Sequence, residues 1–422
     1  MNKRASLKRV FEIIPGGLSW GIIISLIFLS IKYPVASAII IITFDFYWII
    51  RTVYLTTLLI MAHHRLSQQR GEDWLGRCLG LPEDRGFFQL YQLVIFPVYN
   101  EGLEVLRPAL VSLTASHYPK EKFIVVMAFE ERNIQAPDIA LILEKEFSAK
   151  FGAYLSTFHP DGLPGESRIK GANATWSAKA ARKFIDSRGI AHEHVVVSCF
   201  DADTCVEPEY FGCLSYHFLT SEKRHQASYQ PMPVYNNNIW QAPSFARLVE
   251  ISSSFCQLIE SMRLEKFVTF SSHSMSFKTL VDVDYWPTNM ISDDSVIYWK
   301  SYLHYNGDYR VVPLYVTVSM DVAYSSNIWR TIVVQYKQKR RWAWGVENFP
   351  FVVDGFIKNK NISLFNKLRR SFHLLESHVT WAIWAVILVV IGYLPMLSGG
   401  VFFSQTAIAY NLPKITGLLF KF

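Results

Sequence analysis

Three long apolar runs lie near the two ends of the chain. Residues 18–31 are almost wholly apolar, residues 35–62 continue as a second run, and residues 379–397 form a third. As a helix, the second run of about 28 residues would reach roughly 40 Å, which exceeds the roughly 30 Å hydrocarbon core of a bilayer. Only 18% of the residues are charged, against about a quarter in a typical soluble domain. The chain is therefore predicted to have helices in lipid at both ends.

Basic residues flank these runs and predict their orientation. They precede the first run, follow the second at 63–65 and precede the third at 367–370. By the positive-inside rule, these flanks are expected in the cytoplasm. A cleaved signal peptide is the alternative for the first run, but cleavage would leave an equally long apolar run directly behind it. Residues 401–422 are interrupted by Pro413 and Lys414, and form either a kinked fourth span or an interfacial segment.

Charge and cysteine usage exclude several classes of protein. The net charge of +7 does not arise from a basic stretch within one polar domain, so nucleic acid is not an expected partner. The five cysteines form no CxxC pair and have no spacing typical of zinc, which predicts reduced thiols facing the cytoplasm. Two charges inside the second run, Asp45 and Arg51, would be costly in lipid unless they are paired or face a polar path, such as a route for the acceptor.

The middle of the chain has the pattern of a parallel α/β sheet. A short apolar run at 92–98 is followed by leucines at helical spacing over 103–113, and then by a second apolar run at 123–127. Strand, helix and strand at this spacing predict a βαβ unit. A third strand is predicted at 195–199, and polar residues follow each strand. Open α/β sheets bind their ligands at this carboxyl edge.

Two acidic pairs follow in the sequence. Asp201 and Asp203 stand two residues apart after the strand at 195–199, so both carboxylates can point to one side and suit Mg²⁺ or Mn²⁺. A solvated turn is the alternative for this pair. Asp293 and Asp294 follow Ser292 and open a helical pattern. These acids either cap and stabilise the N-terminus of a helix, or one of them removes a proton from a sugar hydroxyl.

A basic segment ends the polar middle of the chain. On a helix, Gln338, Arg341 and Trp342 share one face and present an amide, a guanidinium and an indole together. Arginine suits pyrophosphate oxygens, and tryptophan offers a flat apolar platform for a sugar ring. The alternative is an electrostatic anchor beside the membrane.

In this order, the motifs closely resemble those of membrane-integrated family-2 glycosyltransferases, the group of the cellulose, chitin and hyaluronan synthases and glucosylceramide synthase. The resemblance is carried by residues 96–101, 170–173, 201–203, 293–294 and the intact QxxRW motif at 338–342. It implies an α/β GT-A domain, Rossmann-like and binding a nucleotide sugar, flanked by transmembrane helices. Residues 1–65 would form an N-terminal helix pair, 66–350 a cytoplasmic catalytic domain with interfacial helices, and 351–422 an interfacial segment with C-terminal transmembrane helix or helices.

The resemblance also implies roles for individual residues. The donor would be bound by Pro97, Tyr99, Glu101, Glu130, Lys170, Asp201, Gln338 and Arg341. Glu130 stands where the family usually has an aspartate. Asp203, together with Asp201, would hold Mg²⁺ or Mn²⁺. Asp294 matches the general base, beside Asp293 in place of a more usual glutamate, and Trp342 would lie at the acceptor.

These roles describe an inverting glycosyltransferase of the hexosyltransferase type. It would move a sugar from a nucleoside-diphosphate donor, a UDP-sugar by the resemblance, to a hydroxyl of a lipid-linked or growing polysaccharide acceptor. Three or four spans are few for a secretion channel, because a pore must be fully lined by protein. A short product or the participation of partner subunits is therefore expected. A catalytically inert membrane scaffold that retains the fold is the alternative, and the intact motifs argue against it.

Overall fold

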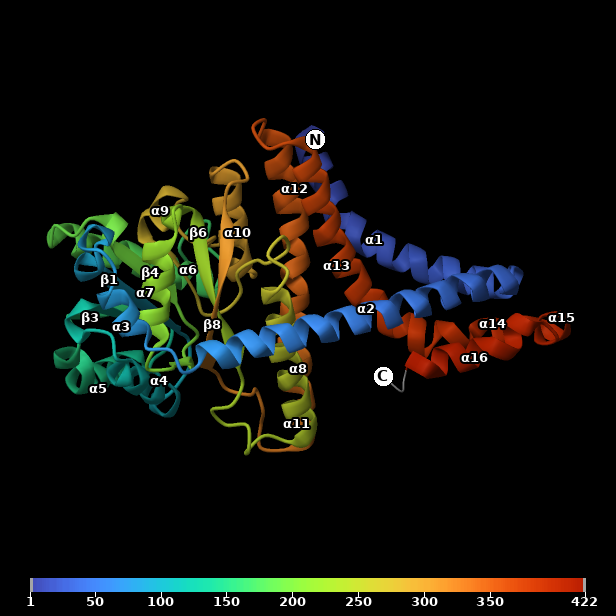
Figure 1. Cartoon of the computed structure of the whole chain (residues 1–422), viewed down its shortest axis with the longest axis horizontal. Helices are drawn as coiled ribbons and strands as arrows, with labels where there is room; N and C mark the ends of the chain where they lie inside the picture. Colours follow the sequence, from blue (N-terminus) through green and yellow to red (C-terminus); the bar gives the residue numbers. More distant parts are fainter. Residues whose placement is uncertain (1–2, 420–422) are drawn as a thin grey trace. The chain divides into compact units, whose positions relative to one another are not determined.

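The computed structural model describes residues 3–419, and the chain divides into two compact units (Figure 1). The central unit is Met61–Gly345. The terminal unit combines Met1–Ile60 with Val346–Phe422.

Within the described residues, three helices are long and apolar enough to cross a membrane. They are α1 (Lys3–Lys32), α2 (Pro34–Gln69) and α13 (Leu364–Val389). The first two predicted apolar runs lie within α1 and α2. The third run, predicted at 379–397, lies within α13 only as far as Val389, and its remainder forms a short 3₁₀ turn (Ile391–Tyr393) and the start of the next helix. The last residues of α2, from Met61, belong to the central unit. In the terminal unit, Leu26, Ile41 and Ile383 are buried in one apolar cluster, so the three helices pack on one another.

The two charges of the second apolar run each have a polar partner in the terminal unit. The hydroxyl of Thr416 donates to Asp45 Oδ2 at 2.7 Å. Arg51 Nη1 donates to Glu376 Oε1 at 3.0 Å. Of the two predicted arrangements, each charge is therefore paired, and both partners are supplied by the C-terminal part of the chain.

The C-terminal segment is broken into short helices. After α12 (Asn348–Lys358) and α13 come α14 (Leu394–Ser398), α15 (Gly400–Ser404) and α16 (Ala407–Leu419). With 13 residues, α16 is shorter than the roughly 20 residues that a straight span needs. Residues 420–422 of the predicted fourth span lie outside the described residues.

A mixed eight-stranded sheet forms the middle of the central unit, in the order β3-β2-β1-β4-β7-β6-β8-β5. Its strands are β1 (Tyr91–Val98), β2 (Phe123–Glu130), β3 (Ala153–His159), β4 (Val195–Cys199), β5 (Cys205–Val206), β6 (Ala227–Val234), β7 (His273–Ser276) and β8 (Arg310–Ser319). The three predicted strands are confirmed as β1, β2 and β4, which are parallel to one another. The predicted helix is α4 (Leu103–Ala115), the crossover between β1 and β2.

Helices cover both faces of this sheet (Figure 1). Val94 and Phe96 of β1 pack in the cluster that includes α4, α5 (Ala136–Phe147) and α7 (Tyr210–Thr220). On the other face, Leu93 and Ile95 pack against α6 (Lys170–Ser187). Because the parallel strands are buried on both faces, their sequences are continuous apolar runs rather than alternating ones.

Small side chains bring α6 close to the sheet. Ala174, Ala178 and Ala181 form its buried face. At the first turn of α6, Asn173 Nδ2 donates to the carbonyl of Ala128 in β2 at 2.6 Å. The N-terminus of α6, which begins with Lys170, is thereby held at the carboxyl edge of the parallel strands.

Candidate active site

The turn after β1 is closed by a carboxylate. Glu101 Oε2 accepts the backbone N–H groups of Tyr99 at 2.6 Å and Asn100 at 3.1 Å. The guanidinium of Arg132 lies 4.6 Å from the centre of the Tyr99 ring. Residues predicted to line the donor pocket, from Pro97 at the end of β1 to Glu101, therefore form one ordered turn at the carboxyl edge of the sheet.

Glu130, the last residue of β2, takes part in a buried network that sequence reasoning missed. Its Oε2 lies 3.3 Å from His159 Nδ1 and 3.4 Å from Arg132 Nε. The other nitrogen of the same imidazole, His159 Nε2, lies 2.8 Å from Glu166 Oε2. The parallel register pairs Glu130 with His159, the last residue of β3. Two carboxylates therefore share one imidazole, where the sequence predicted a single acid.

Lys170 connects the two acidic motifs. Its Nζ donates to Asp201 Oδ1 at 2.7 Å and lies 3.1 and 3.3 Å from the two carboxylate oxygens of Asp294. Burial disfavours the lysine cation, but the charges of Asp201 and Asp294 outweigh it and hold the pKa of Lys170 well above its usual value. Burial likewise opposes ionisation of Asp201, but Lys170 lowers the pKa of that carboxyl overall. The hydroxyl of Ser271 also donates to Asp201 Oδ2.

Asp203 has a buried oxygen without a hydrogen-bond partner. Its Oδ2 accepts the backbone N–H of Asp321 at 2.9 Å, whereas Oδ1 is buried and unpartnered. Burial and the nearby Asp201 carboxylate raise the pKa of Asp203 to about 7, and the Asp321 carboxylate adds to the effect. Sequence reasoning missed Asp321, which follows β8.

These carboxylates fit a divalent cation, because an unpartnered carboxylate oxygen beside other negative charges is suited to a hard cation. Across residues 3–419, no group of three or more His, Cys, Asp or Glu side chains is arranged to hold a metal ion. Donor phosphate oxygens and water would therefore have to complete the coordination of a cation held by Asp203 and Asp201.

The second acidic pair opens α10 (Asp293–His304), and its two members differ. Asp294 faces Lys170 and is about a quarter exposed (23%). Asp293 is buried, and its Oδ2 has no partner. Burial, followed by the charge of Asp294, raises the pKa of Asp293 well above its usual value. A side chain at Gly171 would collide first with the carbonyl oxygen of Pro287 at 2.4 Å and then with Asp293 Cβ at 2.8 Å, so this glycine leaves room for both the backbone and the buried acid.

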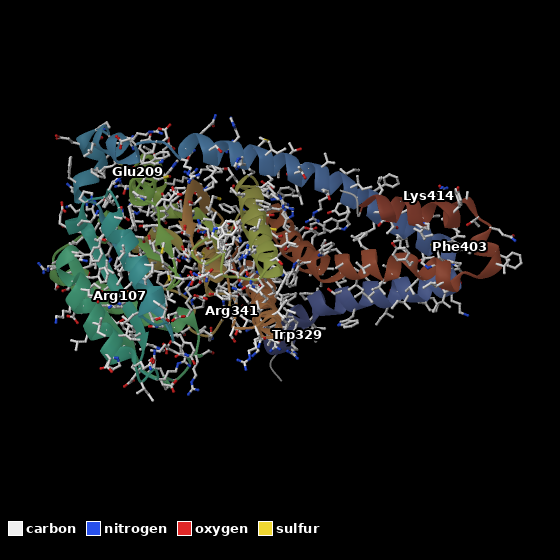
Figure 2. All side chains as sticks on the ribbon, turned by 90° about the horizontal axis from the view of Figure 1, so that it is seen from below. Arg107, Glu209, Trp329, Arg341, Phe403 and Lys414 are labelled. Carbon is white, nitrogen blue, oxygen red and sulfur yellow. The ribbon has the colours of Figure 1, made fainter. Side chains whose placement is uncertain are left out.

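The QxxRW motif lies on α11 (Ile328–Ala343). Arg341 is exposed. Burial raises the pKa of Asp201, Lys170 and then the hydrogen bond from Ser271 lower it, and the charge of Arg341 adds a smaller lowering effect. Figure 2 shows Arg341 among side chains of the central unit, with Trp329 towards the other end of the same helix. Gln338 Oε1 is buried without a hydrogen-bond partner.

Trp342 is held by contacts that sequence reasoning missed. Lys339 Nζ lies 3.5 Å from the centre of its indole ring. The same Nζ lies 3.1 Å from Glu250 Oε2 of α8 (Ser244–Ser261), whose side chain is fully buried. An ion pair therefore joins α11 to α8 next to the predicted acceptor residue.

His273, at the start of β7, is a further residue that sequence reasoning missed. Its side chain is fully buried, and its Nδ1 lies 3.7 Å from Asp294 Oδ1. The only local signal is that it stands in the polar run Ser271-Ser272-His273, in a segment that proves to be buried.

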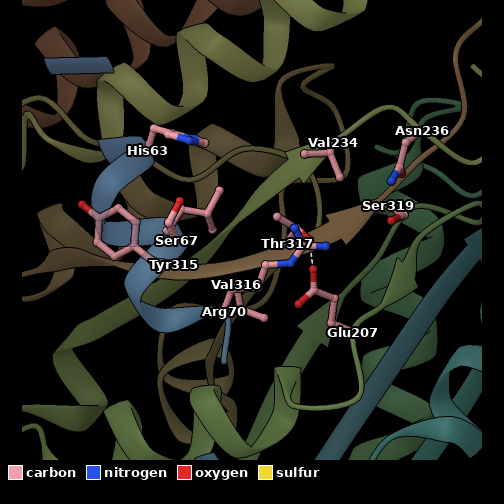
Figure 3. Close-up of a pocket in the computed structure, with 11 residues that line it drawn as sticks. His63, Ser67, Arg70, Glu207, Val234, Asn236, Tyr315, Val316, Thr317 and Ser319 are labelled. Atoms are coloured by element: carbon pink, nitrogen blue, oxygen red, sulfur yellow. Dashed lines mark hydrogen bonds between the residues drawn. The ribbon is translucent and has the colours of Figure 1, made fainter. Parts of the chain in front are cut away.

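A cavity of about 280 Å³ lies in the central unit, between the end of α2 and the strands β6 and β8 (Figure 3). Its walls include His63 and Ser67 of α2, Arg70 just after that helix, and Glu207, which accepts a hydrogen bond from the Thr317 hydroxyl. None of the predicted site residues lines it.

Comparison with known proteins identifies a family. The model described as glycosyl transferase family group 2 matches residues 196–417. A search of curated proteins finds no match.

Several solved structures are similar to this chain at low identity. One is the mannosyltransferase PcManGT from Pyrobaculum calidifontis in complex with GDP-Man and Mn²⁺. It shares 15% identity over 87% of this chain and 96% of its own, with a TM-score of 0.46. S. aureus TarS shares 15% identity over 78% of this chain and 52% of its own, with a TM-score of 0.46. The TarS fragment 1–349 in complex with UDP-GlcNAc shares 15% identity over 78% of this chain and 86% of its own, with a TM-score of 0.46.

The family assignment depends on the matched segment rather than on these low similarities. That segment runs from β4 through both acidic motifs and the QxxRW helix, and it exceeds half of the chain. The α/β GT-A fold expected from the motifs is confirmed, and the chain belongs to glycosyl transferase family group 2.

Proposed function

We propose that this glycosyltransferase moves a sugar, with inversion, from a nucleoside-diphosphate donor to a hydroxyl of a lipid-linked or growing polysaccharide acceptor. The observation that carries the proposal is the position of Lys170, whose one ammonium contacts both Asp201 and Asp294. Asp201, proposed beside the donor, and Asp294, proposed as the base, are thus bridged by the single side chain of Lys170. Transfer requires this proximity, because the base must act opposite the leaving group.

Cations of the site would stabilise the leaving group. Cleavage of the bond between the anomeric carbon and phosphate builds negative charge on the diphosphate. Lys170 and Arg341 are the candidate partners for this charge, and Gln338 offers an amide beside them. Asp203 and Asp201 would hold Mg²⁺ or Mn²⁺, which would act as a Lewis acid on the same phosphates. The buried, unpartnered Oδ1 of Asp203 supports this role.

Asp294 is the proposed general base. An acceptor hydroxyl has a pKa far above 7, so its proton must move to a base as the oxygen attacks. Asp294 is partly exposed beside Lys170, whereas Asp293 is buried and its raised pKa favours the protonated form. We therefore assign the proton transfer to Asp294 and a supporting position to Asp293.

The remaining residues would orient the two substrates. The nucleotide pocket would be lined by Pro97, Tyr99 and Glu101. Glu130 would accept a hydrogen bond from an N–H of the nucleobase, such as the N–H of uracil. Trp342 would offer its indole face to the acceptor, because it is 40% exposed and held by Lys339. These assignments favour a UDP-sugar as donor and a hexosyltransferase reaction.

We further propose an integral membrane protein with its catalytic part in the cytoplasm. The three candidate spans and the basic residues that flank them support this topology. Residues 1–65 and 351–422 would be the membrane parts and 66–350 the catalytic part. Membrane lipids would then be partners, and partner subunits would be needed for a long, secreted product.

A panel of nucleotide sugars tests the proposal. Membranes containing the full chain would receive UDP-glucose, UDP-GlcNAc or GDP-mannose with Mg²⁺ or Mn²⁺, and nucleotide release and product size would be measured. The wild type should release nucleotide from at least one donor. Asp294→Asn should lose turnover by at least about a hundredfold, because the proton has no acceptor, while nucleotide binding persists.

The matched control is Arg107→Gln, which removes an exposed ion pair with Glu146 on the far helices α4 and α5. It should turn over like the wild type. If, with every donor, the wild type released no more nucleotide than membranes without the protein, the inert scaffold would be the better description. Normal turnover by Asp294→Asn would remove Asp294 from the mechanism.

A further inference from the structure

His273 is a buried imidazole beside the proposed base, and the mechanism above gives it no role. The antiparallel register of β4 and β7 pairs Cys199 with His273. Because β7 begins where β4 ends, His273 lies at the same edge of the sheet as Asp201. Its side chain is fully buried, with Nδ1 3.7 Å from Asp294 Oδ1.

The hydrogen-bond partners of His273 determine its tautomer. Its Nδ1 lies 3.1 Å from the carbonyl oxygen of Phe270. A carbonyl only accepts, so Nδ1 must carry a hydrogen. Its Nε2 lies 3.4 Å from the indole nitrogen of Trp286, which only donates, so Nε2 must carry a lone pair. The partners therefore specify a neutral imidazole with its hydrogen on Nδ1, the nitrogen nearer to Asp294.

Burial favours the same state, because it lowers the pKa of His273 despite the opposing charge of Asp294. The other charged groups near this position are Lys170 and Asp201. Lys170 bonds to both carboxylate oxygens of Asp294 in the described arrangement. Under the proposed function, Lys170 approaches the donor diphosphate, and Asp294 then needs a partner that does not move.

A neutral N–H dipole suits the position beside Asp294 better than a second cation would. A second cation beside Asp294 would favour its ionised form strongly and so weaken it as a base. A fixed N–H dipole orients the carboxylate with a smaller loss of basicity. The imidazole is itself held between a backbone carbonyl and a buried indole, so it is pre-oriented before substrate binds.

We propose that His273 is a positioning residue. Its Nδ1–H is held by the Phe270 carbonyl, and the dipole of this fixed N–H, with Nδ1 3.7 Å from Asp294 Oδ1, orients that oxygen electrostatically and leaves Oδ2 to take the proton of the acceptor hydroxyl. This inference rests on the proposed function, because it assumes that Asp294 is the base. It adds a residue that acts through Asp294 and touches neither substrate.

Two substitutions of similar size test the inference in the full chain. His273→Leu removes the N–H, whereas His273→Asn keeps an amide N–H near the place of Nδ1. The substrate is whichever of UDP-glucose, UDP-GlcNAc and GDP-mannose the wild type turns over. His273→Leu should lower kcat by at least about tenfold through misplacement of the base, with KM for the donor unchanged. His273→Asn should recover kcat to within about threefold of the wild type.

The inference is overturned if His273→Leu has the wild-type kcat, or if the two variants are equally impaired while both bind UDP like the wild type. A readout independent of activity uses ¹⁵N-histidine NMR of the wild type, with the His273 signal assigned by its loss in His273→Asn. The hydrogen should be found on Nδ1. A hydrogen on Nε2 instead would overturn the inference whatever kcat the two variants show.

Asp294→Asn in the same assay separates this inference from the proposed function. If that variant retains turnover, Asp294 is not the base, and both proposals fall. If it is inactive while His273→Leu is normal, only the role of His273 falls.

Discussion

At the scale of single residues, the site is organised around ion pairs between neighbouring side chains. Lys170 stands between Asp201 and Asp294, and its ammonium offsets the cost of burying both carboxylates. Asp203 lacks such a cation, which explains why its pKa is raised while that of Asp201 is lowered. The uncompensated acid is thus the one in the best position to receive a metal ion.

This difference predicts a pH dependence of metal binding. Because the pKa of Asp203 is about 7, the carboxyl is mostly protonated below pH 7, and a cation must displace the proton. Mn²⁺ affinity in the presence of UDP should therefore rise by up to about tenfold per pH unit below 7 and level off above it. Isothermal titration calorimetry between pH 6 and pH 8 measures this dependence.

Asp203→Asn is the matched variant for this titration. It should bind Mn²⁺ weakly and with little dependence on pH over the same range. An equally steep pH dependence in Asp203→Asn would show that another group takes up the proton.

At the scale of elements, two helices are joined by a buried ion pair. Lys339 stands within the QxxRW motif on α11, whereas Glu250 on α8 belongs to no motif in the sequence, and together they hold the helix that carries Gln338, Arg341 and Trp342. Exposed apolar residues on the same helices include Trp329, Tyr336 and Leu248. The contact between α11 and α8 therefore includes a charge pair whose carboxylate is fully buried.

Removal of one partner of this pair should be more harmful than removal of both. Lys339→Met leaves the Glu250 carboxylate buried and uncompensated, which typically costs about 3–5 kcal/mol. The double variant Lys339→Met with Glu250→Leu should recover most of this loss, because no buried charge remains. Chemical denaturation followed by tryptophan fluorescence measures the difference. Equal stability of the single and double variants would mean that the ion pair carries little of the packing.

Helix α7 carries a second element-scale prediction. His217 packs on Trp74 of α3 (Trp74–Leu79) with ring centres 5.4 Å apart, and its Nε2 is buried without a partner. Burial, followed by the charge of Arg77, lowers the pKa of His217 to about 4. In the unfolded chain the imidazole has a pKa of about 6.5, and above this pH the burial of the neutral ring does not reduce the free energy of unfolding. As the pH falls from about 6.5 towards 4, the unfolded chain binds a proton that the folded chain does not, and the free energy of unfolding decreases.

Acid sensitivity should therefore decrease in His217→Phe. Between pH 7 and pH 5, His217 should account for about 2 kcal/mol of lost stability, because the unfolded chain binds a proton that the folded chain does not. The variant keeps an aromatic ring against Trp74 and cannot be protonated. Unfolding measured at both pH values would show the difference, and an unchanged acid sensitivity in the variant would contradict it.

At the scale of the whole molecule, the proposed topology makes a labelling prediction. Tyr33 lies between α1 and α2, and Lys145 is exposed on α5 of the central unit. In a background without reactive cysteines, Tyr33→Cys should react with a membrane-impermeant maleimide in intact cells, and Lys145→Cys should react only after permeabilisation. The reverse pattern would place the catalytic part on the other side of the membrane. Equal labelling of both in intact cells would contradict a membrane-spanning arrangement.

The candidate site shows which contacts depend on sheet registers. His159 meets Glu130 because β2 and β3 pair these two residues. Asp321 reaches Asp203 because β5 and β8 pair Cys205 with Ser319. These partners are far apart in the sequence and follow no motif, so the order of the strands had to be known before they could be identified.

The sequence by itself determined the apolar helices, the strands β1, β2 and β4, the acids at the strand ends and the family. Each of these depends on residues within one short segment, where hydrophobic period and turn residues act locally. Only the tertiary structure decided that Lys170 bridges two motifs, that Asp293 is buried while Asp294 faces Lys170, and that the buried imidazole of His273 lies beside Asp294. Burial, charge compensation and tautomer depend on neighbours from distant segments, which come together only when the sheet forms.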